Sequence, residues 1–191
     1  MQQRPSHAVA GDSHDSFLAM LLERYHEVLT VRYLARKRLI ELTFLADGEI
    51  GTGQFMHLRT QLQRAGEAIG VLLSIPPGSL RCRRSFVLGY TQLTIQRDLD
   101  TLSVEELDVL VALVRQVLGP RLVVEPLASG EGPSGDVADD DGASPERLAH
   151  HLEALKRRRR IHTLIGLRHS GQPLVYDMVT SPASSAGARH R

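Results

Sequence analysis

Five consecutive cations form the densest charged cluster in the sequence: Lys156, Arg157, Arg158, Arg159 and Arg160. They follow a stretch with helical spacing, and cations at the C-terminal end of a helix interact favourably with its dipole. A cluster of this kind suits phosphate contacts, because neutralising a phosphate releases its counterion. The simpler interpretation is a solvated helix end beside an acidic segment. The cluster therefore supports anion or nucleic-acid binding as an alternative function.

Two further groups of cations occur earlier in the chain, at residues 36–38 and at Arg81, Arg83 and Arg84. They would form a wide positive surface if the fold placed them side by side, which the sequence does not decide. Nearby acids such as Glu41 can pair with the first group along a helix. We therefore interpret both groups as solvated faces.

The remaining reactive side chains do not form a recognisable catalytic or metal site. His150 and His151 are adjacent and would diverge by about 100° on a helix, so they are poorly placed to chelate one ion. His162 and His169 could meet across a hairpin, but no second metal-binding pattern accompanies them. We expect no metal-binding residues and no cofactor.

Cys82 is the single cysteine, and the arginines around it would lower the pKa of its thiol. A catalytic thiol also needs a base and a pocket, and the sequence indicates neither. The glycines at 48, 51 and 53 follow a predicted helix and lack the Gly-Lys-Ser/Thr ending of a phosphate loop, so they indicate a turn. We expect a non-enzymatic protein without catalytic residues.

The elements that would position these groups are predicted to be mostly helical. Residues 17–46 contain no Pro or Gly, and their apolar residues recur at helical spacing, which predicts one long helix. Its apolar surface is too wide for one neighbouring helix to cover, which indicates a protein partner or a second copy. The residues expected to bind that partner are Leu18, Leu21, Tyr25, Val28, Tyr33 and Leu42.

A second amphipathic helix is predicted at residues 54–74, after the glycine-rich turn, so the two would form an antiparallel helical hairpin. Residues 80–99 fit either a strand pair or a helix, and the helical neighbours favour a helix. Ser103 and Glu106 form a capping-box pattern that opens a helix at 104–118. Another helix is predicted at 145–159, followed by two β-like segments at 161–167 and 174–180 that resemble a hairpin.

The fold class expected from these elements is mainly α: a long antiparallel helical hairpin, additional packed helices and a small C-terminal β-hairpin. The predicted organisation is a disordered tail at 1–12, a helical core at 13–127, an acidic flexible linker at 128–144, a basic helix with the β-hairpin at 145–180 and a disordered tail at 181–191.

Composition limits the classes of function without selecting one. The chain has 191 residues, 42% of them hydrophobic, and a net charge of +1. The first residues lack the apolar core of a signal peptide, and no stretch approaches the roughly 20 apolar residues that cross a bilayer. We expect a cytoplasmic protein, or a nuclear one in a nucleated cell. The favoured function is a non-catalytic interaction, adaptor or assembly protein that binds a protein partner or itself.

Overall fold

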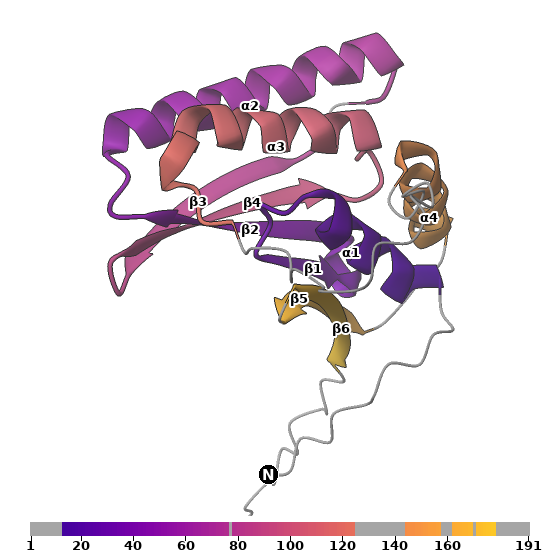
Figure 1. Ribbon diagram of the computed structural model, residues 1–191. Helices are drawn as coiled ribbons and strands as arrows, with labels where there is room; N and C mark the ends of the chain where they lie inside the picture. Colours follow the sequence, from indigo (N-terminus) through magenta and orange to yellow (C-terminus); the bar gives the residue numbers. More distant parts are fainter. Residues whose placement is uncertain (1–12, 77, 125–143, 158–161, 170, 179–191) are drawn as a thin grey trace, which may run out of the picture.

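The structure is a computed structural model that describes residues 13–76, 78–124, 144–157, 162–169 and 171–178. Its helices are α1 (Ser13–Arg24), α2 (Thr52–Leu73), α3 (Val104–Leu118) and α4 (Pro145–Arg157). Its strands are β1 (Thr30–Leu34), β2 (Leu39–Asp47), β3 (Leu80–Val87), β4 (Tyr90–Asp98), β5 (Thr163–His169) and β6 (Gln172–Met178). All six strands belong to one antiparallel sheet with the order β3-β4-β2-β1-β5-β6 (Figure 1). The expected mainly helical fold is therefore wrong.

The long helix predicted at residues 17–46 is replaced by α1, β1 and β2. Strand β1 buries alternate side chains, Val31 and Tyr33, whereas β2 buries residues on both of its faces. Tyr33 also lies four positions after Leu29 and seven before Ile40, a spacing that fits a helix equally well. No Gly or Pro marks the reversal between β1 and β2. Arg38 makes it with a left-handed φ of 51°, and its Nε donates to the carboxylate oxygens of Asp100 at 2.9 and 2.8 Å. A distant acid thus supports a turn that local sequence does not reveal.

The helix favoured at residues 80–99 is also wrong, because β3 and β4 form a hairpin there. Its register pairs Val87 with Tyr90, which leaves Leu88 and Gly89 as a two-residue turn. Both have positive φ values, 54° and 86°, as a type I′ turn requires. The strand pair that the sequence left open is what forms.

Four other predictions lie close to the observed positions: α2, α3, α4 and the β5–β6 hairpin. At the start of α3, the Ser103 hydroxyl accepts a hydrogen bond from the Glu106 amide at 3.1 Å, as the capping box predicts. The Glu106 side chain, however, pairs with Arg97 of β4 instead of returning to Ser103. After α3, Leu122 forms an isolated antiparallel bridge with Ala46 of β2.

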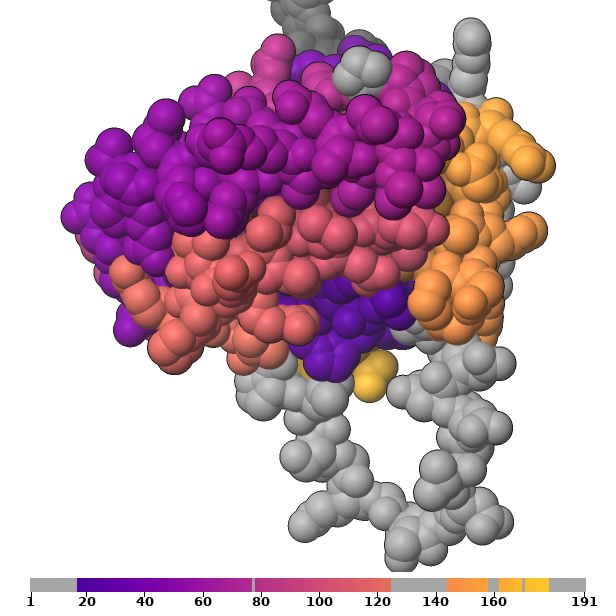
Figure 2. Space-filling model, turned by 90° about the horizontal axis from the view of Figure 1, so that it is seen from above, coloured from indigo at the N-terminus to yellow at the C-terminus, as the bar shows by residue number. Residues whose placement is uncertain are grey.

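The core lies between one face of the sheet and the helices. Figure 2 looks onto the helices and shows α2 and α3 side by side, with α4 beside them. Helix α1 packs on the same face over β5, where Gly166 has no side chain. A β-carbon there would lie 3.3 Å from the β-carbon of Leu18 and 2.8 Å from a methyl group of Val31. Gly166 therefore permits the close packing of α1 on the sheet.

Side chains that point to the opposite face of the sheet are mostly polar. Because successive residues of a strand alternate between faces, Arg32 and Glu41 of β1 and β2 point there, as do Arg81 and Arg83 of β3 and Gln96 of β4. Arg32 and Gln96 both donate to the Glu41 carboxylate, at 3.0 and 2.7 Å. This face differs in chemistry from the apolar face under the helices.

Candidate interaction surface

The side chains that the sequence analysis assigned to a protein partner lie in the core. Leu18, Leu21 and Tyr25 are on α1 or just after it, Val28 precedes β1, and Tyr33 and Leu42 are on β1 and β2; all six are buried. Tyr25 is further held by its hydroxyl, which donates to Asp108 of α3 at 2.9 Å. Burial is the main cause that raises the pKa of this phenol. None of these residues presents a surface to a partner in this fold, which removes the physical support that they gave to partner binding.

Exposed apolar side chains gather instead at the tip of the β3–β4 hairpin. We call the five residues from Phe86 to Tyr90 the hairpin tip. Leu88 is 91% exposed, and Phe86, Val87 and Tyr90 are each more than one-third exposed. Fully burying a leucine side chain is worth about 1.5–3 kcal/mol, so leaving Leu88 in water forgoes that stabilisation. The tip thus carries apolar surface that the described part of the chain leaves uncovered.

The backbone at the tip is unfavourable for the residue that occupies it. Leu88 has a φ of 54°, a left-handed conformation that costs non-glycine residues about 1–2 kcal/mol and that Asn or Gly accepts more readily. A leucine at this position combines backbone strain with exposed apolar surface. Such combinations concentrate at sites of function.

Polar contacts fix the base of the tip to the start of α2. The Arg84 guanidinium donates to the Thr52 hydroxyl at 2.9 Å and to the Ile50 carbonyl oxygen, and it lies over the Phe55 ring. On β4, the Thr91 hydroxyl donates to the Gly48 carbonyl at 2.7 Å. The hairpin tip is therefore presented on an ordered support, which lowers the entropy cost of binding.

A second apolar surface lies at the other end of α2. Its last turns and the following segment surround a shallow hollow of about 550 Å³. The residues that line it are Glu67, Gly70, Val71, Ser74, Ile75 and Pro76. Val71 is 83% exposed at its edge, and the neighbouring Leu72 is also largely exposed. We call this surface the α2 hollow.

Backbone hydrogen bonds shape the α2 hollow. Ser74 ends the helix with a left-handed φ of 55°, and the Ile75 amide donates to the Gly70 carbonyl at 2.8 Å. This C-terminal motif turns Ile75 and Pro76 back beside the last turn of α2. Because α2 has 22 residues, it is about 33 Å long, and the hairpin tip and the α2 hollow lie near its opposite ends (Figure 1).

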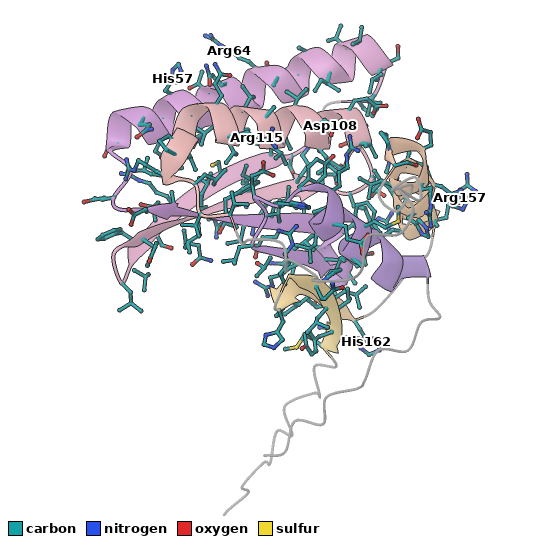
Figure 3. The ribbon with its side chains drawn as sticks, in the orientation of Figure 1. His57, Arg64, Asp108, Arg115, Arg157 and His162 are labelled. Atoms are coloured by element: carbon teal, nitrogen blue, oxygen red, sulfur yellow. The ribbon has the colours of Figure 1, made fainter. Side chains whose placement is uncertain are left out.

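The basic cluster at 156–160 lies partly outside the described residues, which end at Arg157 in this segment. Lys156 pairs with Glu153 at 2.7 Å, and its carbonyl oxygen accepts a hydrogen bond from Arg38 at 2.7 Å. Arg157 is exposed on the outer side of α4 (Figure 3). Anion binding by the whole cluster stays a prediction, because Arg158, Arg159 and Arg160 are not described.

The structure shows where the histidines and the cysteine considered as reactive groups lie. His162 precedes β5 and His169 ends it, so they lie at opposite ends of that strand. The described residues contain no group of three or more potential metal ligands. Cys82 faces the core side of β3, and burial raises the pKa of its thiol to about 12, whereas nearby Arg59 lowers it less. Desolvation therefore outweighs the effect of Arg59, and the sequence neighbours Arg81 and Arg83 point to the opposite face of the sheet.

A hollow of about 230 Å³ between α2, α3 and the sheet is bordered by Arg97 and Glu106. The Arg97 guanidinium donates to both Glu106 carboxylate oxygens, at 2.6 and 3.1 Å, and to the Thr101 hydroxyl at 2.7 Å. Its nitrogens are thus engaged within the chain, so this pair fixes α3 to β4 and does not offer a free group to a ligand.

Sequence reasoning missed both the hairpin tip and the α2 hollow. A Leu-Gly pair between two apolar segments was the available signal for the tip, but Leu is not a typical residue for that turn position. The α2 hollow depends on how far α2 extends beyond its neighbours, which helical periodicity does not reveal.

Comparison of the chain with protein-family models, curated proteins and solved structures finds no match. Among the helices of the described residues, none combines the length and apolarity that crossing a membrane demands.

Proposed function

We propose that the protein is a non-catalytic assembly protein in which the hairpin tip of one copy binds the α2 hollow of a second copy. The observation that carries this proposal is Leu88: an apolar side chain, 91% exposed, held in a left-handed turn on an anchored hairpin. A natural binding partner for such a projecting apolar side chain is an apolar depression. The α2 hollow supplies one on the same chain.

The choice of a second copy follows from finding both complementary surfaces on one chain. They lie at opposite ends of α2, so the contact is head-to-tail, and a contact of this kind builds rings or open chains instead of stopping at a symmetric dimer. A tip of five residues buries less than the roughly 800 Å² per partner of a standard stable interface. Association is therefore weak and depends on protein concentration.

A cytoplasmic or nuclear location is part of this proposal. A single cysteine is compatible with a reducing compartment. The exposure of the hairpin tip does not depend on the cellular compartment.

We predict that Leu88→Asn abolishes self-association and stabilises the fold. Asn accepts the left-handed turn, so the free energy of unfolding should rise by about 0.5–1 kcal/mol. Removing the apolar side chain should at the same time leave the protein monomeric at concentrations where the wild-type chain assembles. Sedimentation velocity over a concentration series measures assembly, and urea denaturation measures stability.

Met178→Gln is the matched control, because Met178 is also an exposed apolar residue but lies on β6, at the opposite edge of the sheet. It should associate as the wild type does. A wild-type chain that stays monomeric throughout the series, or a Leu88→Asn variant that associates equally well, would overturn the proposal.

A further inference from the structure

A third hollow, with quite different chemistry, opens on the face of the sheet opposite the helices. It has a volume of about 370 Å³ and is lined by Lys37, Leu39, Ser79, Arg81, Arg83 and Gln96. This volume falls near the lower end of the range for small-molecule sites, which is about 300–1,000 Å³. Three of its six lining residues are cations and none is an acid. We call it the basic hollow.

Sheet register brings these cations together from distant parts of the chain. Arg81 and Arg83 are two positions apart on β3, so their side chains share one face about 7 Å apart. Arg81 lies opposite Gln96 of β4, and the start of β2 lies beside the end of β4. Lys37, in the short 3-10 helix Ala35–Lys37 just before β2, completes the hollow. The two early basic groups of the sequence thus contribute to one surface.

The cations of the basic hollow have no carboxylate partner among the described residues, whereas neighbouring arginines do. Arg32 pairs with Glu41, Arg38 with Asp100 and Arg97 with Glu106. By register Glu41 and Asp98 share this face, but the Glu41 oxygens already accept from Arg32 and Gln96, and Asp98 accepts from the amide and hydroxyl of Thr101. The fold therefore gathers like charges here without neutralising them, which is unfavourable unless an anion binds.

We propose that the basic hollow binds a compact, phosphate-rich anion such as a diphosphate or triphosphate group. Two guanidinium groups can each donate paired hydrogen bonds to phosphate oxygens, and Lys37 adds a third positive charge. Several negative charges on one small group match three cations around one hollow. The lining residues include no aromatic ring on which a nucleobase could stack, so the site favours free phosphates over base-reading contacts with nucleic acid.

This site is independent of the cluster at 156–160 and of the assembly proposed above. It uses neither Leu88 nor the residues that line the α2 hollow. Leu88→Asn should therefore leave anion binding unchanged.

Titration calorimetry with inorganic pyrophosphate at low ionic strength tests the proposal on the full chain. The double variant Arg81→Gln/Arg83→Gln should bind pyrophosphate at least about tenfold more weakly, because it loses the charge-assisted hydrogen bonds that both guanidinium groups donate. Arg59→Gln/Arg64→Gln is the matched control, because both residues are exposed on α2, and Arg64 points away from the sheet (Figure 3). The control should retain wild-type affinity. Thermal melting establishes that both double variants remain folded.

A parallel titration with a single-stranded oligothymidylate distinguishes the two sources of phosphate. The proposal is supported if the protein binds the oligonucleotide more weakly than it binds pyrophosphate. Its affinity for pyrophosphate should also fall as the salt concentration rises. Tighter oligonucleotide binding that is lost in the Arg81→Gln/Arg83→Gln variant would assign the basic hollow to nucleic-acid phosphates and overturn the compact ligand. Absence of pyrophosphate binding at low salt, or equal losses in both double variants, would overturn the site itself.

Discussion

Replacing Glu106 by Gln should lower the free energy of unfolding by about 3–5 kcal/mol, the cost of breaking a buried ion pair. The side chains of Arg97 and Glu106 are only 6% and 3% exposed, and they form two hydrogen bonds. Gln keeps the size of the side chain but removes its charge, which leaves the Arg97 guanidinium buried without its counterion. Urea denaturation followed by circular dichroism measures the change.

Glu105→Gln is the matched control for this prediction, because Glu105 is the preceding residue in the first turn of α3 and is exposed. Its loss should cost less than about 1 kcal/mol, the usual scale of a surface charge at a helix N-terminus. The double variant Arg97→Met/Glu106→Leu should recover part of the stability lost in Glu106→Gln, since neither buried charge then remains. Equal, small losses in Glu106→Gln and Glu105→Gln would contradict a structural role for the pair.

Replacing Gly166 by Val should destabilise the protein by about 3 kcal/mol, the upper end of the usual cost of overpacking. A β-carbon at this position would already lie within 3.3 Å of Leu18, Leu22 and Val31. The contact with the β-carbon of Leu18 is the least tolerant, because that atom is attached directly to the backbone of α1. Helix α1 would therefore have to move away from β5, and urea denaturation should show the loss.

Gly53→Ala provides a control of opposite sign. Gly53 lies in the first turn of α2, and a β-carbon there meets no heavy atom within 4 Å. Alanine should stabilise the helix by about 0.5 kcal/mol, because glycine loses more backbone entropy on folding. If Gly166→Val were no less stable than Gly53→Ala, the packing of α1 on β5 would be contradicted.

Elements with strong local boundaries could be predicted from the sequence. Helix α3 follows Ser103, whose side chain caps it, and stops before Gly119, which a proline follows. Helix α2 follows a glycine-rich turn and has a clear amphipathic pattern. The β5–β6 hairpin follows from β-branched residues and a glycine in the turn, Gly171, which has a φ of 77°. In each case neighbouring residues supply most of the structural information.

The strands β1 and β2 could not be separated from a helix because the information that breaks the chain there is not local. Arg38 adopts its left-handed conformation while its guanidinium contacts Asp100 and the carbonyl oxygen of Lys156, which are 62 and 118 positions away. Similarly, the β3–β4 turn uses leucine where Asn or Gly is typical. Because Leu88 is unfavourable in a left-handed turn, the sequence does not indicate the turn there. The same residue identifies the hairpin tip as a candidate site.

The candidate surfaces depend on three-dimensional register, which is why sequence analysis identified their residues without joining them. The groups around Lys37 and around Arg81 were recognised as basic, but only the pairing of β2, β4 and β3 places them around one hollow. In contrast, the apolar residues of α1 were interpreted as part of a longer helix that contacts a partner, whereas Leu18 and Leu22 pack against β5. Their partner is the chain's own sheet.

Mixing two complementary variants tests the proposed assembly most directly. Leu88→Asn lacks the apolar tip but keeps the α2 hollow, whereas Val71→Lys blocks the α2 hollow but keeps the tip. Lysine is compatible with the last turn of α2, because cations there are favoured by the helix dipole. Each variant alone should be monomeric in sedimentation velocity, and the equimolar mixture should form a one-to-one dimer that grows no further. Continued association of either variant alone, or a mixture that stays monomeric at concentrations where the wild type assembles, would contradict the head-to-tail contact.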